Sequence, residues 1–321
     1  MVNARTGALK ARIRYPDIDH RPGDCRGSIL VANLSGGPYP RELLVSWDYA
    51  SVTALDSHLN VLWSRVLEHE WARTDVTMAH TTYVADIDGD GREEIMAGSC
   101  LLNGDGRTRW VAPDLPALVE DGHADSVQIA QLRVDGPANV VMSTGAYCFD
   151  AEGTLLWGLD ELKHGQAQHV GKLREDVPGR QVVVYEGASR VDPALPDRVL
   201  ALNADGELLW EFTVVQPDMQ EGGFGFWLGD WDGDGLDEVW VNDPEKVNIL
   251  DGAGRVIDTL SGHLIYVFDM IGDWRAEGVL LTSIEPGMEM QVWTNDRPND
   301  DPITGEVPDT RETTRAMTNC T

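Results

Sequence analysis

The sequence predicts an all-β fold, a β-propeller of four-stranded blades. Short apolar runs recur along the 321 residues, and turns rich in Asn, Asp and Gly separate them. No long stretch places apolar residues at the 3.6-residue spacing of an amphipathic helix. Four short strands in each period of roughly 40–55 residues are typical of a propeller blade.

The first recurring unit is a β-hairpin, in which two apolar segments flank a polar turn. It occurs five times, at residues 54–63, 101–110, 148–157, 201–210 and 249–258. The first four copies end in Trp63, Trp110, Trp157 and Trp210, which are 47, 47 and 53 residues apart. This spacing sets the period of the predicted blade.

The second unit precedes each hairpin and consists of a strand, a polar Gly-rich loop and another strand. It occurs six times, at residues 28–47, 82–99, 127–144, 168–187, 226–243 and 266–283. One copy of each unit supplies the four strands of a blade.

The blade count follows from these copies and from the chain ends. Residues 2–11 and 290–296 resemble parts of an outer hairpin, so we expect both termini to build one blade together. The prediction is a single domain over 1–321 with seven blades, and six or eight blades are the alternatives. Residues 297–321 are expected to form an irregular tail or an incomplete blade, which leaves a fragment as a further alternative.

Composition excludes several classes of partner. Asp and Glu number 54 against 25 Lys and Arg, which gives a net charge of −29. Nucleic acids and anionic membranes both require a basic surface, so neither is an expected partner. No apolar run is long enough to span a membrane, and we expect the first residues not to act as a signal peptide. Cys25, Cys100, Cys148 and Cys320 lack the spacing of a zinc site. We expect a monomer.

Two loops carry carboxylates with the spacing of a calcium site. Residues 86–94 read DIDGDGREE and residues 230–238 read DWDGDGLDE. Ca²⁺ prefers roughly six to eight oxygen ligands, and alternate residues of a tight loop turn their oxygens inward. We therefore expect Ca²⁺ in both loops. The expected ligands are Asp86, Asp88, Asp90, Arg92 and Glu94 in the first loop, and Asp230, Asp232, Asp234, Leu236 and Glu238 in the second.

In this assignment Arg92 and Leu236 bind through their backbone carbonyls. The alternative is an Asp-Gly turn that is capped by its own side chains and holds no ion. Asp269, Asp273 and Glu277 keep part of the pattern, which makes a third ion a weaker alternative. We expect these ions to have a structural role, because they would pin loops on the rim of the blades.

Two histidines are candidates for acid–base chemistry. His123 and His164 hold the same place in neighbouring repeats, which read HADSVQI and HGQAQHV. Inner strands line the central channel of a propeller, so residues that enter them from one face converge near the axis. Histidine titrates near neutral pH and serves as an acid or a base. The alternative is a pair of turn residues bonded to nearby backbone.

Two longer stretches resemble rhamnogalacturonan lyases. Residues 164–186, which begin HGQAQHVGK, resemble the family's HGDALHVGD stretch. Residues 268–296, which begin FDMIGDWRAEG, resemble its ADVLGDWREE segment and the strand pair that follows it. The acidic loops are also shared with that family and, more loosely, with FG-GAP calcium propellers. Gln166 and Lys172 depart from the pattern, because they stand where the family has acidic residues.

The resemblance implies a calcium-containing propeller lyase that cleaves an acidic, uronate-containing polysaccharide by β-elimination. It also implies a secreted or periplasmic protein. In this reaction His123 and His164 are the expected base and acid, in either order. Arg26 is the candidate that neutralises the substrate carboxylate, and Tyr185 is an alternative acid or base.

Two other functions fit the same fold. One is a non-catalytic, calcium-stabilised propeller that binds carbohydrate or protein. The other is a glycoside hydrolase, which would need two carboxylates roughly 5–9.5 Å apart. The sequence offers no obvious pair of this kind outside the acidic loops.

Overall fold

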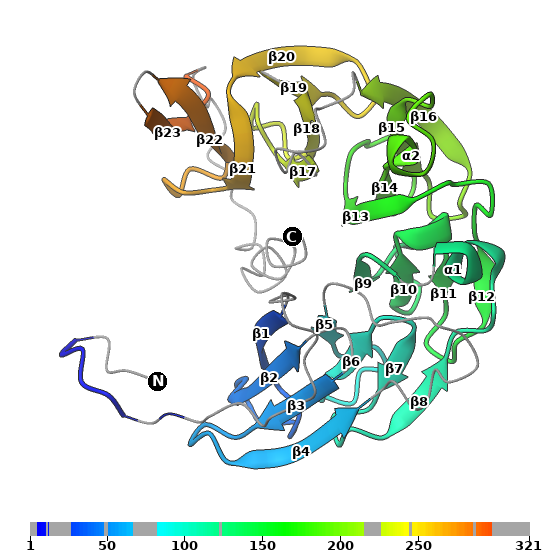
Figure 1. Cartoon of the computed structure of the whole chain (residues 1–321), viewed down its shortest axis with the longest axis vertical. Coiled ribbons are helices and arrows are strands. Elements are labelled where there is room, and N and C mark those ends of the chain that lie inside the picture. The colour runs from blue at the N-terminus through cyan, green and yellow to red at the C-terminus, as the bar shows by residue number, and fades with distance from the viewer. Residues whose placement is uncertain are drawn as a thin grey trace.

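The computed structural model describes residues 5–10, 12, 27–47, 51–66, 82–121, 124–214, 226–243, 246–284 and 287–296. These residues form six antiparallel sheets that follow one another along the chain, five with four strands and one with three. The sheets are arranged around a common axis (Figure 1). The predicted all-β propeller is therefore confirmed.

In each sheet the strands are hydrogen-bonded in chain order. The first sheet contains β1 (Gly27–Ala32), β2 (Glu42–Trp47), β3 (Ser51–Leu55) and β4 (Val61–Val66). The second contains β5 (Thr82–Ala85), β6 (Glu94–Ala97), β7 (Cys100–Leu102) and β8 (Thr108–Val111). The third contains β9 (Val127–Ala130), β10 (Asn139–Met142), β11 (Cys148–Phe149) and β12 (Leu155–Trp157).

The remaining sheets follow the same order. The fourth contains β13 (Gly165–Gly171), β14 (Gln181–Glu186), β15 (Asp197–Leu202) and β16 (Leu208–Val214). The fifth contains β17 (Phe226–Gly229), β18 (Glu238–Asp243), β19 (Lys246–Leu250) and β20 (Val256–Ser261). The sixth contains β21 (His263–Phe268), β22 (Glu277–Ile284) and β23 (Gly287–Trp293).

Short helices lie in the connections. They are α1 (Pro116–Asp121), α2 (Ala188–Val191) and a 3₁₀ turn at Thr144–Ala146. Within the described part of the chain, no helix is long and apolar enough to span a membrane.

The seven-blade arrangement stays a prediction. Residues 290–293 belong to β23, the third strand of the sixth sheet. Residues 5–10 contain a single bridge at Leu9, and residues 2–4, 11 and 297–321 lie outside the described residues. The described chain therefore accounts for six sheets and leaves the predicted terminal blade untested.

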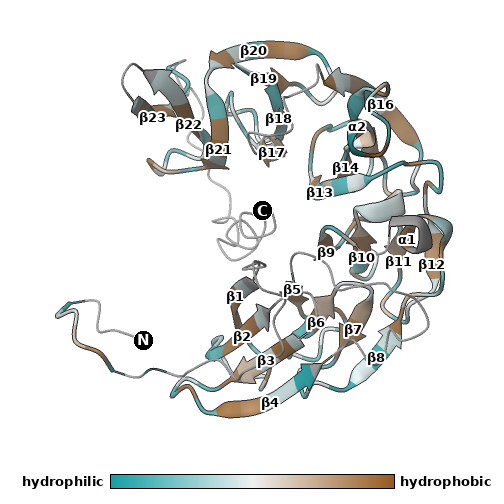
Figure 2. Cartoon of the chain, in the orientation of Figure 1, coloured by the Kyte–Doolittle hydropathy of each residue, from teal (hydrophilic) through white to brown (hydrophobic). Residues whose placement is uncertain are grey.

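The core lies between neighbouring sheets. Tyr83 and Met96 of the second sheet pack with Ile129 and Val140 of the third in one buried cluster. Comparable clusters join the other consecutive sheets, and the strands that build them are predominantly hydrophobic (Figure 2). Burying both faces of the sheets in this way explains the continuous apolar runs in strands such as β14.

The four periodic tryptophans link each sheet to the next. Their indole N–H groups donate to backbone carbonyls in the outer turn of the following sheet, from Trp63 to Gly104 (3.0 Å), Trp110 to Ala151 (3.0 Å), Trp157 to Ala204 (3.1 Å) and Trp210 to Gly252 (3.0 Å). Each ring covers a glycine with positive φ. A Cβ on Gly153, for example, would lie 2.7 Å from the ring of Trp110.

In each sheet a loop joins the first strand to the second, and backbone hydrogen bonds hold these loops side by side at one end of the propeller. An N–H group at the end of one loop donates to a carbonyl in the same loop of the preceding sheet. The bonds run from Glu93 to Asn33 O (3.0 Å), Arg180 to Leu132 O (2.8 Å), Asp237 to Lys172 O (2.8 Å) and Ala276 to Asp230 O (2.6 Å). The starts of the inner strands lie at the opposite end. Because β13 has seven residues, the two ends are roughly 20 Å apart.

Candidate functional site

A buried polar network lies where the inner strands of the third and fourth sheets begin. Asp125, His164 and Gln166 are 2%, 7% and 9% exposed. Asp125 and Gln166 hold equivalent positions in the two repeats, two residues after His123 and His164. The propeller therefore brings equivalent residues of neighbouring blades into contact.

The contacts within this network fix the His164 ring against a carboxylate. The Gln166 amide Nε2 donates to Asp125 Oδ1 at 3.0 Å. Asp125 Oδ2 lies 3.4 Å from His164 Nε2, and Gln166 Oε1 lies 3.2 Å from the same nitrogen. A buried carboxylate is costly unless it is hydrogen-bonded, and Gln166 meets part of that need by bonding to Oδ1, while Oδ2 faces the imidazole.

Arg190 of α2 completes the network. Its Nη1 donates to Gln166 Oε1 and lies 3.4 Å from His164 Nε2. Arg190 is exposed, whereas Gln166 and His164 are buried. A guanidinium therefore covers the imidazole on the solvent side.

Local contacts hold α2 in this position. The N–H of Gly187 donates to His164 O at 2.7 Å, and the N–H of Ser189 donates to Asp197 Oδ1 at 2.8 Å. A Cβ at Gly187 would lie 3.4 Å from both Arg190 Cδ and His164 Cδ2. The turn after β14 therefore lies close to the ring, at a distance that would be an ordinary van der Waals contact for a Cβ at Gly187.

Two of the four predicted catalytic residues, His164 and Tyr185, lie among the described residues. His164 lies in the network, while His123 and Arg26 lie outside the described residues, so their convergence with His164 stays a prediction. Tyr185 is 2% exposed, and its hydroxyl donates to Asp197 Oδ2 at 3.0 Å. Burial and the Asp197 carboxylate raise its pKa strongly. These contacts favour a structural role for Tyr185.

Asp125, Gln166 and Arg190 were not predicted as site residues. A signal for the first two exists in the sequence, because Asp125 of HADS and Gln166 of HGQA hold equivalent positions in the two repeats. No repeat or motif marks Arg190, because it lies in a connection whose shape depends on tertiary contacts.

The second histidine of the HGQAQHV stretch has a packing role. His169 lies 4.9 Å from the Phe226 ring and 6.0 Å from the Trp227 ring, measured between centroids. Complete burial lowers its pKa to about 4. His169 is therefore neutral at physiological pH and belongs to the core between the fourth and fifth sheets.

The acidic loops lie at the other end of the propeller. Asp86, Asp88 and Asp90 bring carboxylate oxygens within 4.8 Å of one another, and Asp230, Asp232 and Asp234 do the same. Among the described residues these are the two carboxylate clusters with room for a metal ion. The first Asp of each loop also accepts backbone N–H groups, from Gly89 and Gly91 in one and from Gly233 and Gly235 in the other.

Glu94 and Glu238 close their loops through the backbone. Glu94 Oε2 accepts the N–H of Ile87 at 3.1 Å, and Glu238 Oε2 accepts the N–H of Trp231 at 2.6 Å. Burial and the neighbouring Asp carboxylates raise their pKa values to about 7 and about 9. In the fourth sheet, whose loop lacks the acidic pattern, Gln181 makes the equivalent bond by accepting the N–H of Leu173 through its Oε1 at 2.8 Å. Loop closure therefore explains this position without an ion, and binding by Glu94 and Glu238 stays a prediction.

The predicted carbonyl ligands Arg92 and Leu236 also help to shape the loops. Their N–H groups donate to Asp90 Oδ1 at 2.7 Å and to Asp234 Oδ1 at 2.8 Å. These bonds hold the preceding carboxylates in place, and ligation by either carbonyl remains a prediction.

The two clusters differ in their neutralising charges. Arg109 Nη1 lies 2.7 Å from Asp88 Oδ2, so an arginine already pairs with the first cluster. In the described structure no such ion pair reaches Asp230, Asp232 or Asp234, and Asp232 Oδ1 is buried without a hydrogen-bond partner. The second cluster is therefore the better candidate metal centre.

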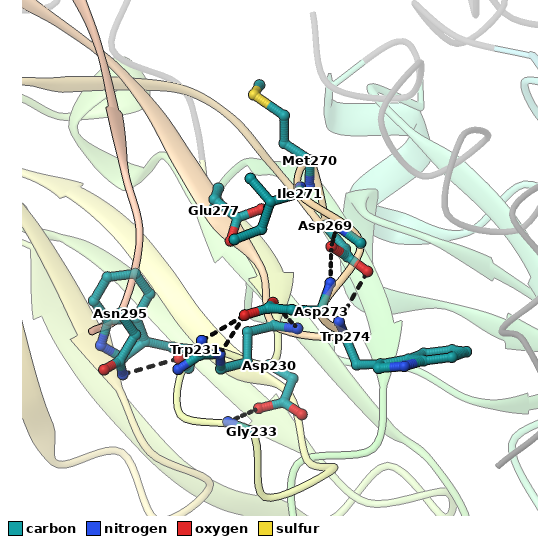
Figure 3. Close-up of polar contacts among 12 residues, drawn as sticks. Asp230, Trp231, Gly233, Asp269, Met270, Ile271, Asp273, Trp274, Glu277 and Asn295 are labelled. Atoms are coloured by element: carbon teal, nitrogen blue, oxygen red, sulfur yellow. Dashed lines mark hydrogen bonds and ion pairs between the residues drawn. The ribbon is translucent and has the colours of Figure 1, made fainter. Parts of the chain in front are cut away.

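The sixth sheet's loop replaces the missing ligands with an ion pair. Asp269 accepts backbone N–H groups from Gly272 and Trp274, and Glu277 accepts those of Met270 and Ile271 (Figure 3). The Arg275 guanidinium pairs with Asp273 in the same loop. The Arg275 side chain thus supplies the positive charge that a third metal ion would otherwise bring to this loop.

Comparison with known proteins identifies curated relatives and solved structures that this chain resembles. No family model matches the chain. The curated rhamnogalacturonan endolyase YesW of Bacillus subtilis is 24% identical over 289 residues, which cover 83% of this chain and 41% of YesW. The rhamnogalacturonan exolyase YesX of the same organism is 24% identical over 303 residues, which cover 84% of this chain and 44% of YesX. The chain is similar to rhamnogalacturonan lyases.

The resemblance predicted from the sequence is thus confirmed, and the chain spans less than half the length of the curated relatives it matches. Solved structures agree on the fold. The crystal structure of YesW superposes with a TM-score of 0.60 at 21% identity, covering 86% of this chain and 46% of that one. The Dos1 propeller superposes with a TM-score of 0.52 at 11% identity, covering 79% and 65%.

Proposed function

We propose that this chain carries the active site of a polysaccharide lyase, which cleaves a rhamnogalacturonan-like, uronate-containing polysaccharide by β-elimination. The observation that carries the proposal is the His164 imidazole, held between the buried Asp125 carboxylate and the Arg190 guanidinium. The similarity to rhamnogalacturonan lyases supports the same reaction class.

The chemistry requires a base, an acid and a cation. A base removes the C5 proton of a 4-linked uronate, a C4–C5 double bond forms, and the C4–O4 bond breaks while an acid protonates O4. Negative charge develops at the C5 carboxylate in the transition state, so a nearby cation stabilises it. His164 takes one of the two proton-transfer roles, and the sequence equivalence of His123 nominates it for the other.

Calcium in the acidic loops belongs to the same proposal as a structural ion. The carboxylate oxygens of the two Asp clusters are the hard ligands that Ca²⁺ prefers. The buried, unpartnered Asp232 Oδ1 fits a metal ligand in the fifth sheet's loop. These loops lie at the opposite end of the inner strands from His164, so an ion there would stiffen the blades and take no part in the reaction.

An ultraviolet assay for unsaturated uronate tests the proposal. We expect the wild-type protein to release absorbing product from rhamnogalacturonan, and His164→Ala to be slower by roughly 10²- to 10⁴-fold, the contribution typical of a general acid or base. His58→Ala is the matched control, because His58 is exposed in the turn between β3 and β4. No absorbing product from any acidic polysaccharide, or full activity in a folded His164→Ala variant, would overturn the assignment and leave a binding propeller.

A further inference from the structure

The residue that follows each inner strand begins the loop to the second strand, and its charge differs between sheets. In the second and fifth sheets it is Asp86 or Asp230, whose carboxylate accepts backbone N–H groups of its own loop. In the fourth sheet it is Lys172, which directly follows β13. An ammonium has three N–H donors and no acceptor, so the loop of the fourth sheet must offer the opposite polarity.

The Lys172 ammonium donates to carbonyl oxygens near the end of its own loop. Its Nζ lies 2.7 Å from Val177 O and 3.0 Å from Gly179 O. Lys172 is half-buried, so these carbonyls replace part of the water that an exposed ammonium would bind. One side chain thus ties the start of the loop to its end.

Packing against the third sheet fixes one of these carbonyls independently of the ammonium. Gly179 has a φ of +75°, and a Cβ on it would lie 2.1 Å from Leu132 O. The same Leu132 carbonyl accepts the N–H of Arg180 at 2.8 Å. The backbone that presents Gly179 O is therefore held in place by the neighbouring loop, and the glycine is required there.

Two other loops without the acidic pattern are closed in a similar way. Gln131 Nε2 donates to Val134 O at 3.1 Å and to Gly136 O at 2.8 Å in the third sheet. Asn33 Nδ2 donates to Gly37 O at 2.8 Å in the first sheet. In these repeats a side-chain nitrogen of the first loop residue binds the loop carbonyls, and Lys172 adds a positive charge to this arrangement.

We propose that the loop of the fourth sheet, residues 172–180, is a cation site that is filled by the chain's own Lys172 ammonium. The site therefore accepts an alkylammonium group and needs no metal ion. This inference does not depend on the lyase function. It implies that β13, which begins directly after His164, is anchored at its far end whatever the calcium concentration.

Hydrogen exchange read by mass spectrometry tests the proposal on peptides that cover residues 173–180. The full chain is compared with Lys172→Met, which removes the charge and the donors, and with Lys172→Ala, which also leaves space for a small cation. Lys10→Met is the matched control, because Lys10 is exposed and its loss changes the net charge by the same amount. The wild-type protein is measured in calcium and in chelator.

We expect Lys172→Met to accelerate exchange in this loop by roughly 10- to 100-fold, the range for losing a charged hydrogen-bond partner. Lys10→Met and the chelator should leave exchange in the loop at its wild-type rate. Propylammonium restores the missing part of the side chain, so it should slow exchange in Lys172→Ala. Tetramethylammonium should not, because it carries the charge without N–H donors.

Wild-type exchange of the loop in folded Lys172→Met would overturn the proposal. Faster exchange of the wild-type loop in chelator would overturn it too, because it would show that a metal ion holds this loop. Equal responses of Lys172→Ala to the two ammonium ions would do the same, since they would show an effect of ionic strength alone. Far-ultraviolet circular dichroism checks folding, and if Lys172→Ala does not fold, Lys172→Met and the chelator comparison decide.

Discussion

The two histidines of the HGQAQHV stretch are five residues apart and have opposite surroundings. His164 faces a carboxylate, an amide and a guanidinium. His169 faces the rings of Phe226 and Trp227. The odd spacing along an extended chain, with a bulge between Gly165 and Ala167, turns the two rings toward different surroundings, although both lie in a buried stretch. One short motif therefore supplies both a reactive group and a core group.

The buried His169 predicts acid sensitivity. Its pKa falls from 6.5 to about 4 on folding, so the fold favours the neutral ring. The full stability is present above pH 6.5, and it is lost as the pH falls from 6.5 toward 4, by roughly 3 kcal/mol in total. Urea unfolding at several pH values should show a shallower decline for His169→Gln than for the wild type. Identical pH dependence of the two unfolding free energies would contradict this explanation.

Sequence reasoning reached His164 because repeats make equivalent positions visible. It missed Arg190 because nothing in a four-residue helix predicts which blade its side chain covers. It proposed Tyr185 from its position at the end of β14, but the sequence does not show that Asp197 accepts its hydroxyl. Contacts between connections are set by tertiary packing, which local patterns do not encode.

At the scale of the elements, the tryptophans add a side-chain hydrogen bond between sheets that also share apolar packing and backbone hydrogen bonds between loops. Each indole forms a hydrogen bond to the next outer turn and lies against a glycine of that turn. The hairpin periodicity predicted the strands well, because hairpin signals are local. It did not predict the hydrogen bonds of the tryptophans, because the backbone carbonyls that accept them lie about one blade further along the chain.

The indole hydrogen bond leads to a stability prediction. Trp110→Phe keeps an aromatic ring over Gly153 and removes the bond to Ala151 O, so it should lower the unfolding free energy by about 1 kcal/mol or somewhat more. Trp293→Phe is the control, because Trp293 donates to Gln291 within its own strand at 3.2 Å. Urea unfolding should give a larger loss for Trp110→Phe. An equal loss in the two variants would argue against a special role for the bond between blades.

The acidic loops give a second prediction at this scale. Saturating Ca²⁺ should raise the melting temperature, since a ligand at 100 times its Kd adds about 2.7 kcal/mol. Asp232→Asn should remove most of this effect, whereas Asp88→Asn should remove less, because Arg109 already balances Asp88. Calorimetric melting with calcium and with chelator measures both. Equal melting temperatures of the wild-type protein in calcium and in chelator would contradict the proposed metal sites.

For the whole molecule, the main consequence of the fold is the separation of two ends. The loop of the second acidic cluster is joined to its neighbour through Asp237 and Lys172 at one end of the inner strands, and the start of β13 places His164 at the other. This separation reduces the conflict between a net charge of −29 and an anionic substrate, because the two Asp clusters found among the described residues lie in loops at the far end of the inner strands. The periodic sequence predicted the radial arrangement, while the charge total alone pointed away from an acidic ligand.

Mass spectrometry of the products from rhamnogalacturonan tests the central claim most directly. Elimination at a uronate predicts fragments with an unsaturated, non-reducing end, each lighter by one water molecule than the corresponding hydrolysis product. These fragments should appear with the wild-type protein and be strongly reduced with His164→Ala. Fragments with the hydrolytic mass, or an unchanged yield of unsaturated product from folded His164→Ala, would contradict a lyase that acts through His164.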